Sequence, residues 1–223
     1  MPTTLKNILD AVMGESGFLI PASYAASLNP DDLQLVYLSS AASDELRDLD
    51  LTQSRVQGSI TLTSATDYAL PDDFFSYVAD TAFQGTIPVD LPTSPSDWAW
   101  VKSYGAGSPS YRVRFMGGRL HVMNPTAGDV IQFEYITSLP WEASGVGKEQ
   151  ATADTDIWRL DRRLLQYAVK WRWKKEKGVE DWKDDLAMFQ AYVSKLRARD
   201  SGAKTIRFGE CEYPDQPYTK LWV

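Results

Sequence analysis

The chain has 223 residues, of which 43% are hydrophobic, with 12 prolines and 14 glycines, a composition typical of a globular protein. The net charge of −7 is unevenly distributed: residues 1–150 hold 8 Lys and Arg against 18 Asp and Glu, whereas residues 151–223 hold 15 against 12. An acidic average argues against a free-standing DNA-binding protein, because counterion release requires clustered cations.

Cysteine usage and apolar runs restrict the class further. Cys211 is the only cysteine, so an intramolecular disulfide is impossible and a structural zinc site is not expected. The first 18 residues lack a charged region followed by a long apolar run, and no apolar stretch approaches the roughly 20 residues that span a membrane. We therefore expect no signal peptide and a soluble protein of a reducing compartment.

Two amphipathic helices are predicted first, over residues 4–13 and 30–49. Thr3 or Thr4 is expected to cap the first helix, and glycines follow its end. The second has an asparagine cap, proline at the first helical position and acidic residues in its first turn, which suits the helix dipole. The apolar spacing predicts the buried positions, which are Leu5, Ile8, Leu9 and Val12, then Leu33, Val36, Tyr37 and Ala41.

A β-rich, proline-punctuated unit is predicted over residues 53–140. RVQGSITLT and VIQFEYIT alternate in polarity as strands do, and the glycine pair in RVRFMGGRLHV predicts a hairpin, since glycine allows positive φ. TIPVDLPTSPSDWAW is proline-rich and is expected to be a loop with one helical turn near Trp98. ASGVGKEQATADTD is expected to be a flexible polar link.

Helical spacing returns near the C-terminal end. Asp154 or Thr155 is expected to cap a helix that ends in KWRWKKEKG, and a second helix is predicted over residues 180–199. The expected buried positions are Ile157, Leu160, Leu164, Ala168 and Trp171, then Trp182, Leu186, Phe189, Val193 and Leu196. The last twenty residues have no helical period, and we expect an extended arm.

The predicted fold class is α+β. A four-helix core of two N-terminal and two C-terminal helices is expected to carry an inserted β-rich unit and an extended C-terminal arm. The expected division assigns residues 1–52 and 151–202 to the helical core, residues 53–150 to the inserted β-rich domain and residues 203–223 to the arm. The first two helices should pack against the last two.

Few residues suggest catalytic or metal chemistry. His121 is the only histidine, lies in a predicted strand and has no nucleophile motif nearby. The acidic pairs Asp72–Asp73 and Asp154/Asp156 are of a kind that holds Mg²⁺ or hydrolyses glycosides, but a turn and a helix start also explain them. Phosphate-binding glycine motifs are absent from the sequence, so we expect no catalytic residue, no metal and no cofactor.

The segment KWRWKKEKG has two interpretations. Aromatic and basic residues in alternation are typical of single-stranded nucleic-acid binding, where bases stack on rings. Cations in the last turn of an amphipathic helix also stabilise it, because they oppose the dipole. The excess of cations from Arg159 to Lys177 should meet acid, either on a partner subunit or on DNA phosphates, and the acids expected from residues 31–50 are Asp31, Asp32, Asp44, Glu45, Asp48 and Asp50.

Four stretches between about residues 69 and 178 carry a family resemblance through their order and spacing. They read LPDDFFSYVADTAF, PVDLPTSPSDWAWVKS, RVRFMGGRLHVMNPTAGDVIQFEYIT and TADTDIWRLDRRLLQYAVKWRWKKEKG. The series resembles the adaptor proteins of tailed bacteriophages, which form the ring that joins the portal to the tail. The large β unit departs from a minimal helical adaptor.

The resemblance implies a structural protein of the virion neck, between head and tail, made in the host cytoplasm. It implies a ring, usually of twelve subunits, that binds the portal protein and a tail or nozzle protein and surrounds genomic DNA without sequence-specific contacts. No membrane and no catalysis are implied. The expected portal-binding residues of the arm are Ile206, Phe208, Tyr213, Tyr218, Leu221 and Trp222. The expected subunit-interface residues are Arg159, Arg162, Arg163, Arg172 and Lys174.

Two other functions remain open at this point. One is a phage-associated peptidoglycan hydrolase that uses an acidic pair, and a lytic assay would detect it. The other is a nucleic-acid-binding module built on the basic helix 159–177, and a salt-dependent shift of DNA would detect it.

Overall fold

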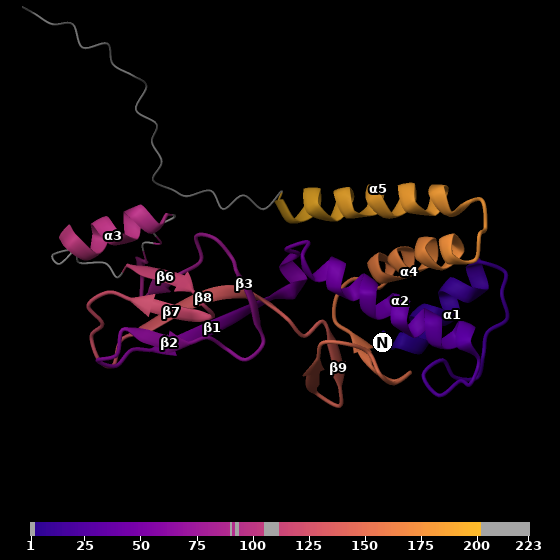
Figure 1. Cartoon of the computed structure of the whole chain (residues 1–223), viewed down its shortest axis with the longest axis horizontal. Helices are drawn as coiled ribbons and strands as arrows, with labels where there is room; N and C mark the ends of the chain where they lie inside the picture. Colours follow the sequence, from indigo (N-terminus) through magenta and orange to yellow (C-terminus); the bar gives the residue numbers. More distant parts are fainter. Residues whose placement is uncertain (1–2, 90, 92–93, 105–111, 202–223) are drawn as a thin grey trace, which may run out of the picture.

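The chain forms a helical unit and a β unit at opposite ends of an elongated molecule (Figure 1). The structure, a computed structural model, describes residues 3–89, 91, 94–104 and 112–201. The helices are α1 (Leu5–Glu15), α2 (Pro30–Arg47), α3 (Pro95–Tyr104), α4 (Arg162–Glu176) and α5 (Trp182–Ser201), with a 3₁₀ turn η1 (Thr52–Ser54). The strands are β1 (Arg55–Thr61), β2 (Asp67–Ala69), β3 (Phe74–Tyr77), β4 (Phe83–Gln84), β5 (Ile87–Pro88), β6 (Val113–Met116), β7 (Arg119–Val122), β8 (Val130–Thr137), β9 (Trp141–Ala143), β10 (Val146–Lys148) and β11 (Ile157–Trp158). The predicted α+β class is confirmed.

Helix α4 is the element on which α1, α2 and α5 all pack. Its residue Leu164 is fully buried, and Phe189 and Leu196 of α5 are buried in the same hydrophobic cluster. Trp171 and Leu186 were also expected to be buried, but both are only half-buried and pack at the edge of the cluster.

Helix α1 follows its sequence pattern closely. The Thr4 hydroxyl accepts a hydrogen bond from the Asn7 N–H at 3.3 Å, which confirms the predicted cap. All four residues predicted to be buried in α1 are fully buried. The start of the helix is anchored to the chain before α4, because the Leu5 N–H donates to the Asp156 carbonyl at 2.8 Å.

Helix α2 buries a different face from the predicted one. Asn29 caps it as expected, but Tyr37 is 74% exposed, whereas Ser39 and Ser43 are fully buried. Each of these two hydroxyls donates to a backbone carbonyl of its own helix at 2.7 Å, so the serines are buried without unsatisfied polar groups. Apolar spacing alone selected the wrong face because internally bonded serines behave as small core residues.

Helix α4 begins later than predicted, because the residues before it pair as a strand. Asp161 is the N-cap, and its carboxylate accepts the N–H groups of Arg163 and Leu164. Strand β11 pairs with β9, and the Trp158 ring lies 4.9 Å from that of the fully buried Trp141. Both tryptophans belong to the helical cluster.

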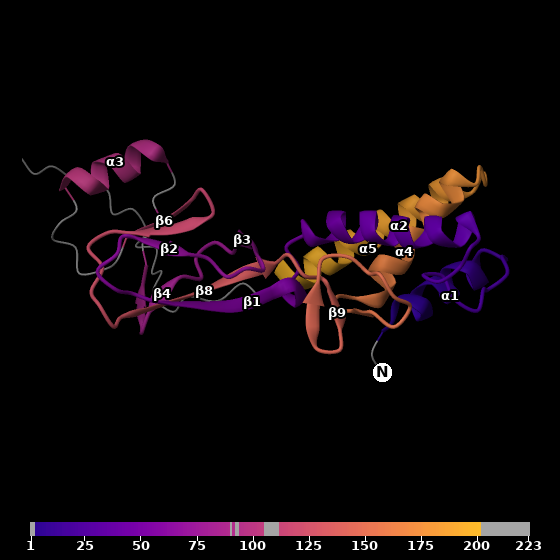
Figure 2. The same cartoon turned by 60° about the horizontal axis from the view of Figure 1, so that its bottom comes forward.

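The first part of the segment expected to be a flexible polar link, residues 143–148, belongs to a β-hairpin instead. Strands β9 and β10 pair across a turn at Ser144 and Gly145, whose φ angles are 50° and 85°. Figures 1 and 2 place this hairpin beside the helical unit, near the joint between the two units. The hairpin was not predicted because its sequence is mostly polar. Only one of its side chains, Trp141, is large and fully buried.

The β unit is built around β8. Strand β1 pairs with it along its whole length, and β3 and β4 pair on its other side. Strands β2, β7 and β6 form a second sheet, with the predicted glycine turn at Gly117 and Gly118, whose φ angles are 60° and 71°. Phe133, Leu120 and other apolar side chains fill the core of this unit.

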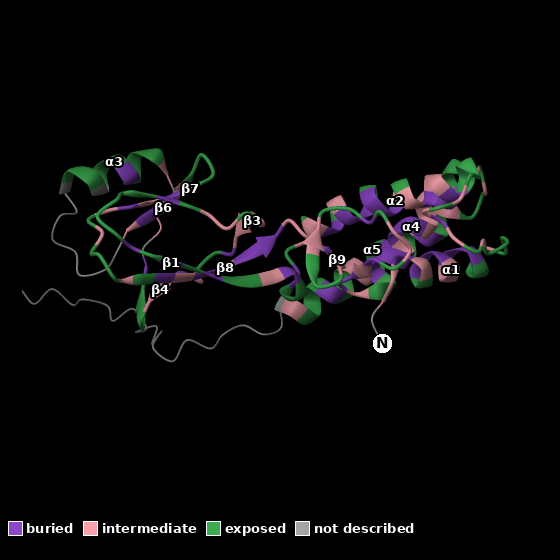
Figure 3. Cartoon of the chain, turned by 90° about the horizontal axis from the view of Figure 1, so that it is seen from below, coloured by how far each residue is buried: buried purple, intermediate pink, exposed green. Residues whose placement is uncertain are grey.

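Helix α3 is longer than the single helical turn predicted near Trp98. It lies over the sheet of β2, β7 and β6 on the side away from β1 and β8, which makes the β unit three layers deep (Figure 3). Of its side chains, Trp98 is buried. The prolines led to the prediction of a loop. Pro95, however, occupies the first position of the helix, where the N–H that proline lacks would have no partner within the helix.

Candidate functional site

The segment KWRWKKEKG forms the C-terminal end of α4, and Gly178 follows the helix with a φ of 68°. Trp173 is 1% exposed and meets the ring of Phe18 edge-on, while the Lys177 ammonium lies 4.4 Å from its ring centroid. Trp171, which was expected to be the buried one of the two, is half-buried beneath the guanidinium of Arg172. A fully buried indole offers no face to a base, so the geometry favours the amphipathic-helix interpretation.

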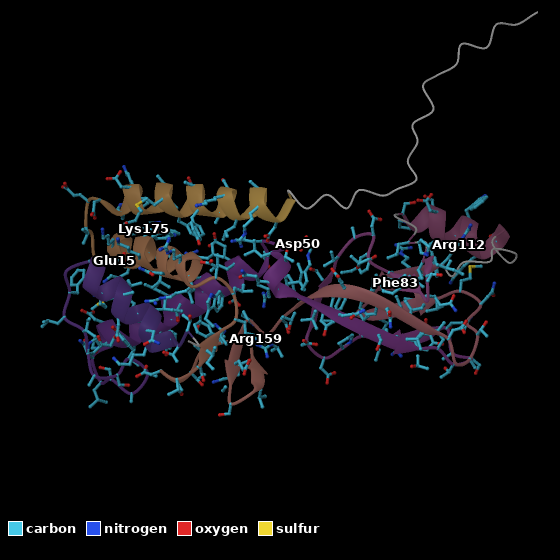
Figure 4. The ribbon with its side chains drawn as sticks, turned by 180° about the vertical axis from the view of Figure 1, so that it is seen from behind. Glu15, Asp50, Phe83, Arg112, Arg159 and Lys175 are labelled. Carbon is cyan, nitrogen blue, oxygen red and sulfur yellow. The ribbon has the colours of Figure 1, made fainter. Side chains whose placement is uncertain are left out.

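Most cations between Arg159 and Lys177 are paired with acids of the same chain. The pairs are Arg159–Glu142 at 3.2 Å, Lys170–Glu15 at 3.2 Å, Lys170–Asp185 at 3.3 Å, Arg172–Glu45, Lys174–Asp181 at 2.7 Å, Lys174–Asp185 at 2.6 Å and Lys177–Asp31 at 2.6 Å. Figure 4 marks Glu15 and Lys175 in the helical unit, with Arg159 and Asp50 nearer the joint. The acid that this basic segment requires therefore comes largely from within the subunit.

Burial and pairing act in opposite directions on two of these cations. Burial would lower the pKa of Lys174, but the carboxylates of Asp181 and Asp185 outweigh it and raise that pKa. Burial lowers the pKa of Arg172 even though Glu45 opposes this effect. Both residues lie within the packed helical unit, and their predicted role at a subunit interface stays a prediction.

Arg162 and Arg163 differ from the other predicted interface residues. Both are exposed in the first turn of α4, where the helix dipole disfavours positive charge. Arg162 donates only to the Asn7 carbonyl at 3.3 Å, and within the described residues neither arginine has a carboxylate partner within ion-pair distance. Of the five predicted interface residues, these two are therefore the ones that could form an ion pair with an acid of another subunit.

Each acidic pair considered for chemistry is engaged in structural hydrogen bonds. The Asp154 carboxylate accepts the N–H groups of Tyr24 and Ala25 at 3.0–3.2 Å, which holds the α1–α2 connection. Asp73 accepts the hydroxyls of Tyr135 at 2.7 Å and Thr137 at 2.8 Å. In the described part of the chain, no group of three or more His, Cys, Asp or Glu is arranged to hold a metal ion.

Asp156 is the most enclosed of these acids, with a side chain 2% exposed. It accepts the Lys148 ammonium at 2.6 Å and the N–H groups of Thr152 at 2.7 Å and Ala153 at 3.0 Å. Burial alone would raise its pKa, but these donors outweigh burial and lower it. The ionised carboxylate thus stabilises the turn that leads from β10 to β11.

Replacing Asp156 by asparagine should lower the free energy of unfolding at pH 7 by about 1–3 kcal/mol, because all three donors bond to one carboxylate oxygen and an amide oxygen lacks the charge that strengthens those bonds. Since the pKa of Asp156 is lowered on folding, its stabilisation is complete above the ordinary aspartate pKa and is lost as the pH falls through the lowered value. The difference between the two proteins should therefore shrink below about pH 4. Urea unfolding at pH 7 and pH 3 measures it.

The matched control is Asp72→Asn, a change to an exposed acid of the other pair. It should alter the unfolding free energy by less than about 0.5 kcal/mol. A loss for Asp156→Asn that is the same at both pH values would show that the carboxylate charge is not what stabilises this turn.

His121 lies on β7 at the wall of a hollow in the β unit. Its Nδ1 pairs with the Asp67 carboxylate, and its Nε2 lies 3.3 Å from the Met116 carbonyl. Both ring nitrogens thus have acceptors, and within the described residues no nucleophile is bonded to the ring.

The predicted portal-binding residues lie outside the described residues. They are Ile206, Phe208, Tyr213, Tyr218, Leu221 and Trp222. Their assignment stays a prediction.

The comparison with protein families assigns the chain. A family model described as SU10 adaptor protein matches residues 3–207, which includes both the helical unit and the β unit. The chain belongs to the SU10 adaptor protein family. It is therefore a phage adaptor, and the family implies a structural role rather than catalysis.

Two further observations accompany this membership. A search of curated proteins found no match. Among the described residues of the adaptor, no helix is both long enough and apolar enough to cross a membrane.

Two surface features of this adaptor were not predicted from the sequence: a pair of exposed leucines and a hollow in the β unit. Leu19 and Leu28 of the α1–α2 connection are 92% and 99% exposed, although Tyr24 between them is fully buried. The hollow beside His121 is formed with α3 and was also missed. Cross-strand register alone would have paired His121 with Asp67, but the position of α3 depends on packing.

Proposed function

We propose that this adaptor forms the ring that joins the portal to the tail in the neck of the virion. In this proposal twelve copies surround the channel through which genomic DNA leaves, without sequence-specific contacts. A portal protein lies on one side, and a tail or nozzle protein lies on the other. The chain is made in the host cytoplasm and is incorporated into the virion. The observation that carries the proposal is the family match over residues 3–207.

The four helices α1, α2, α4 and α5 are proposed as the core of the ring subunit. Their common cluster supports this, because α4 lies at its centre and its enclosed cations Arg172 and Lys174 are paired with acids of the same subunit. Contacts between subunits then depend on groups left at the surface.

Arg162 and Arg163 are proposed as the subunit contact of this helix, together with the other predicted residues Arg159, Arg172 and Lys174. Their exposure at a helix N-terminus supports the proposal, since an acid on the neighbouring subunit would relieve the unfavourable interaction with the dipole. Each exposed pair contributes at most about 1 kcal/mol, but a closed ring repeats the contact at every interface.

Reversing both charges in Arg162→Glu/Arg163→Glu should leave the monomer folded and weaken assembly, because acids would then face acids. Mass measurement of the purified protein at low salt gives the fraction assembled, and circular dichroism checks the fold. The matched control is Lys195→Glu/Arg197→Glu, which reverses two exposed cations of α5. Unchanged assembly of the first variant at low salt would exclude Arg162 and Arg163 from the interface.

No observation on the described residues specifically favours either alternative, the peptidoglycan hydrolase or the nucleic-acid-binding module. The acidic pairs needed for a hydrolase accept structural hydrogen bonds, and the basic helix needed for nucleic-acid binding is mostly paired within the chain. The proposed function is tested by incorporation of the protein into portal-bearing heads, with tail attachment as the readout. Heads that attach tails equally well without it would overturn the proposal.

A further inference from the structure

The β unit contains a hollow of about 180 Å³ between α3 and the sheet of β2, β7 and β6. Trp98 and Lys102 line it from the helix, and Asp67, His121 and Asn124 line it from the sheet side. Figure 3 shows α3 as a separate layer above β6 and β7.

Positive charge gathers on the sheet face that α3 covers. Arg114 is directly opposite His121 in the β6–β7 pairing, and Arg119 is opposite Met116, so these side chains share a face with His121. This concentration is unusual in a part of the chain where residues 1–150 hold only 8 Lys and Arg. Helix α3 adds Lys102 to the same side.

The acid beside these cations is already engaged. Asp67 pairs with Nδ1 of His121, whose Nε2 lies 3.3 Å from the Met116 carbonyl. The Asp67 carboxylate is thus held against the sheet by the imidazole. Within the described residues, Lys102, Arg114 and Arg119 have no carboxylate partner within ion-pair distance.

Lys102 is held at the hollow by an aromatic neighbour. Its ammonium lies 5.7 Å from the ring centroid of Trp98, and Trp98 is 7% exposed. The hollow thus combines an indole wall with a cation that has no carboxylate partner among the described residues. Such a pairing suits a ligand with a carboxylate at the end of a short apolar stem.

We propose that this hollow receives the carboxylate of a glutamate presented by a partner protein. The methylene groups of the glutamate would lie along Trp98, and the carboxylate would accept from Lys102. A hollow between a helix and a sheet admits one side chain more readily than the rigid backbone of duplex DNA. The net charge of −7 also opposes a polyphosphate more than a single carboxylate. The hollow lies within one subunit and does not depend on ring assembly, so this proposal can be tested independently of the proposed function.

The probe is N-acetyl-glutamate α-amide, whose only charge is its side-chain carboxylate, titrated into the full chain at constant ionic strength. The readout is the indole N–H resonance of Trp98 in the NMR spectrum, assigned by its loss in Trp98→Phe.

We expect the resonance to shift saturably as the probe is added, with half of the shift reached at a probe concentration in the millimolar range, on the order of one charge-assisted contact. N-acetyl-glutamine α-amide should give none. Lys102→Gln should weaken binding about tenfold or more, whereas Lys195→Gln on α5 should leave it unchanged.

Three results would overturn the proposal. One is the absence of a saturable shift, and another is an equal response to the glutamate and glutamine probes, which would mean that charge is not recognised. The third is a Lys102-dependent shift with duplex DNA but not with the glutamate probe, which would make the occupant a nucleic acid. Because Lys102 is exposed, its replacement should not disturb folding, and the rest of the spectrum checks this.

Discussion

Replacing Leu164 by alanine should lower the free energy of unfolding by about 2–5 kcal/mol. Leu164 is fully buried in α4, the helix on which α1, α2 and α5 pack, so the deleted methyl groups leave a cavity at the centre of the helical unit. The surrounding side chains belong to several elements, which limits how far they can collapse into the space. Chemical unfolding of the purified protein measures the loss.

The control is the same substitution at Leu19, which is 92% exposed. Leu19→Ala should change the unfolding free energy by about 0.5 kcal/mol or less. A loss below about 0.5 kcal/mol for Leu164→Ala would place Leu164 outside the core and contradict the packing around α4.

Deleting residues 203–223 should leave a folded, soluble protein that no longer attaches to portal-bearing heads. The deleted segment carries Phe208, Tyr213, Tyr218 and Trp222, and Tyr and Trp are frequent anchors of protein interfaces. Pro214 and Pro217 disfavour a helix or a central strand there, so we propose that the segment binds the portal as an extended arm. The stretch from Thr205 to Phe208 is proposed to add an edge strand to the partner.

Attachment is measured as the occupancy of the adaptor on purified heads, and the unfolding curve of the shortened protein checks its stability. Asp200 accepts the Thr52 N–H at 3.0 Å, so a truncation after residue 202 retains this contact of α5. Unchanged occupancy of the shortened protein would mean that the portal contact lies in the helical unit instead.

Elements with strong local signals were predicted well from the sequence. The cap and apolar stripe of α1, the alternation of β8 and the glycine turn between β6 and β7 all depend on neighbouring residues alone. Their local preferences agree with the fold, so no distant contact was needed to find them. The α+β class follows from these elements.

Elements that depend on distant contacts were predicted poorly. Helix α4 begins at Arg162 because β11 pairs with β9, and no local signal reports that pairing. The buried face of α2 depends on serines that bond to their own helix, and the β9–β10 hairpin depends on the burial of Trp141. For α4 and the hairpin a tertiary contact overrides the local pattern, whereas the serine bonds of α2 are local but leave no signal in the apolar spacing.

The candidate interface residues show the same limit. Sequence predicted that the cations of 159–177 meet acids of 31–50, and Arg172–Glu45 and Lys177–Asp31 are such pairs, but they lie within one chain. Charge patterns identify which signs attract, whereas only the fold determines whether the partner is internal. Arg162 and Arg163 are the predicted residues whose charge the fold leaves available.

An averaged image of the virion neck is the measurement that tests the proposed role of this adaptor. We expect a closed ring of the adaptor directly beneath the portal, with the helical units packed side by side and tail density on the opposite face. The proposed role would be wrong if purified virions lack the protein, or hold it in a position that contacts neither portal nor tail.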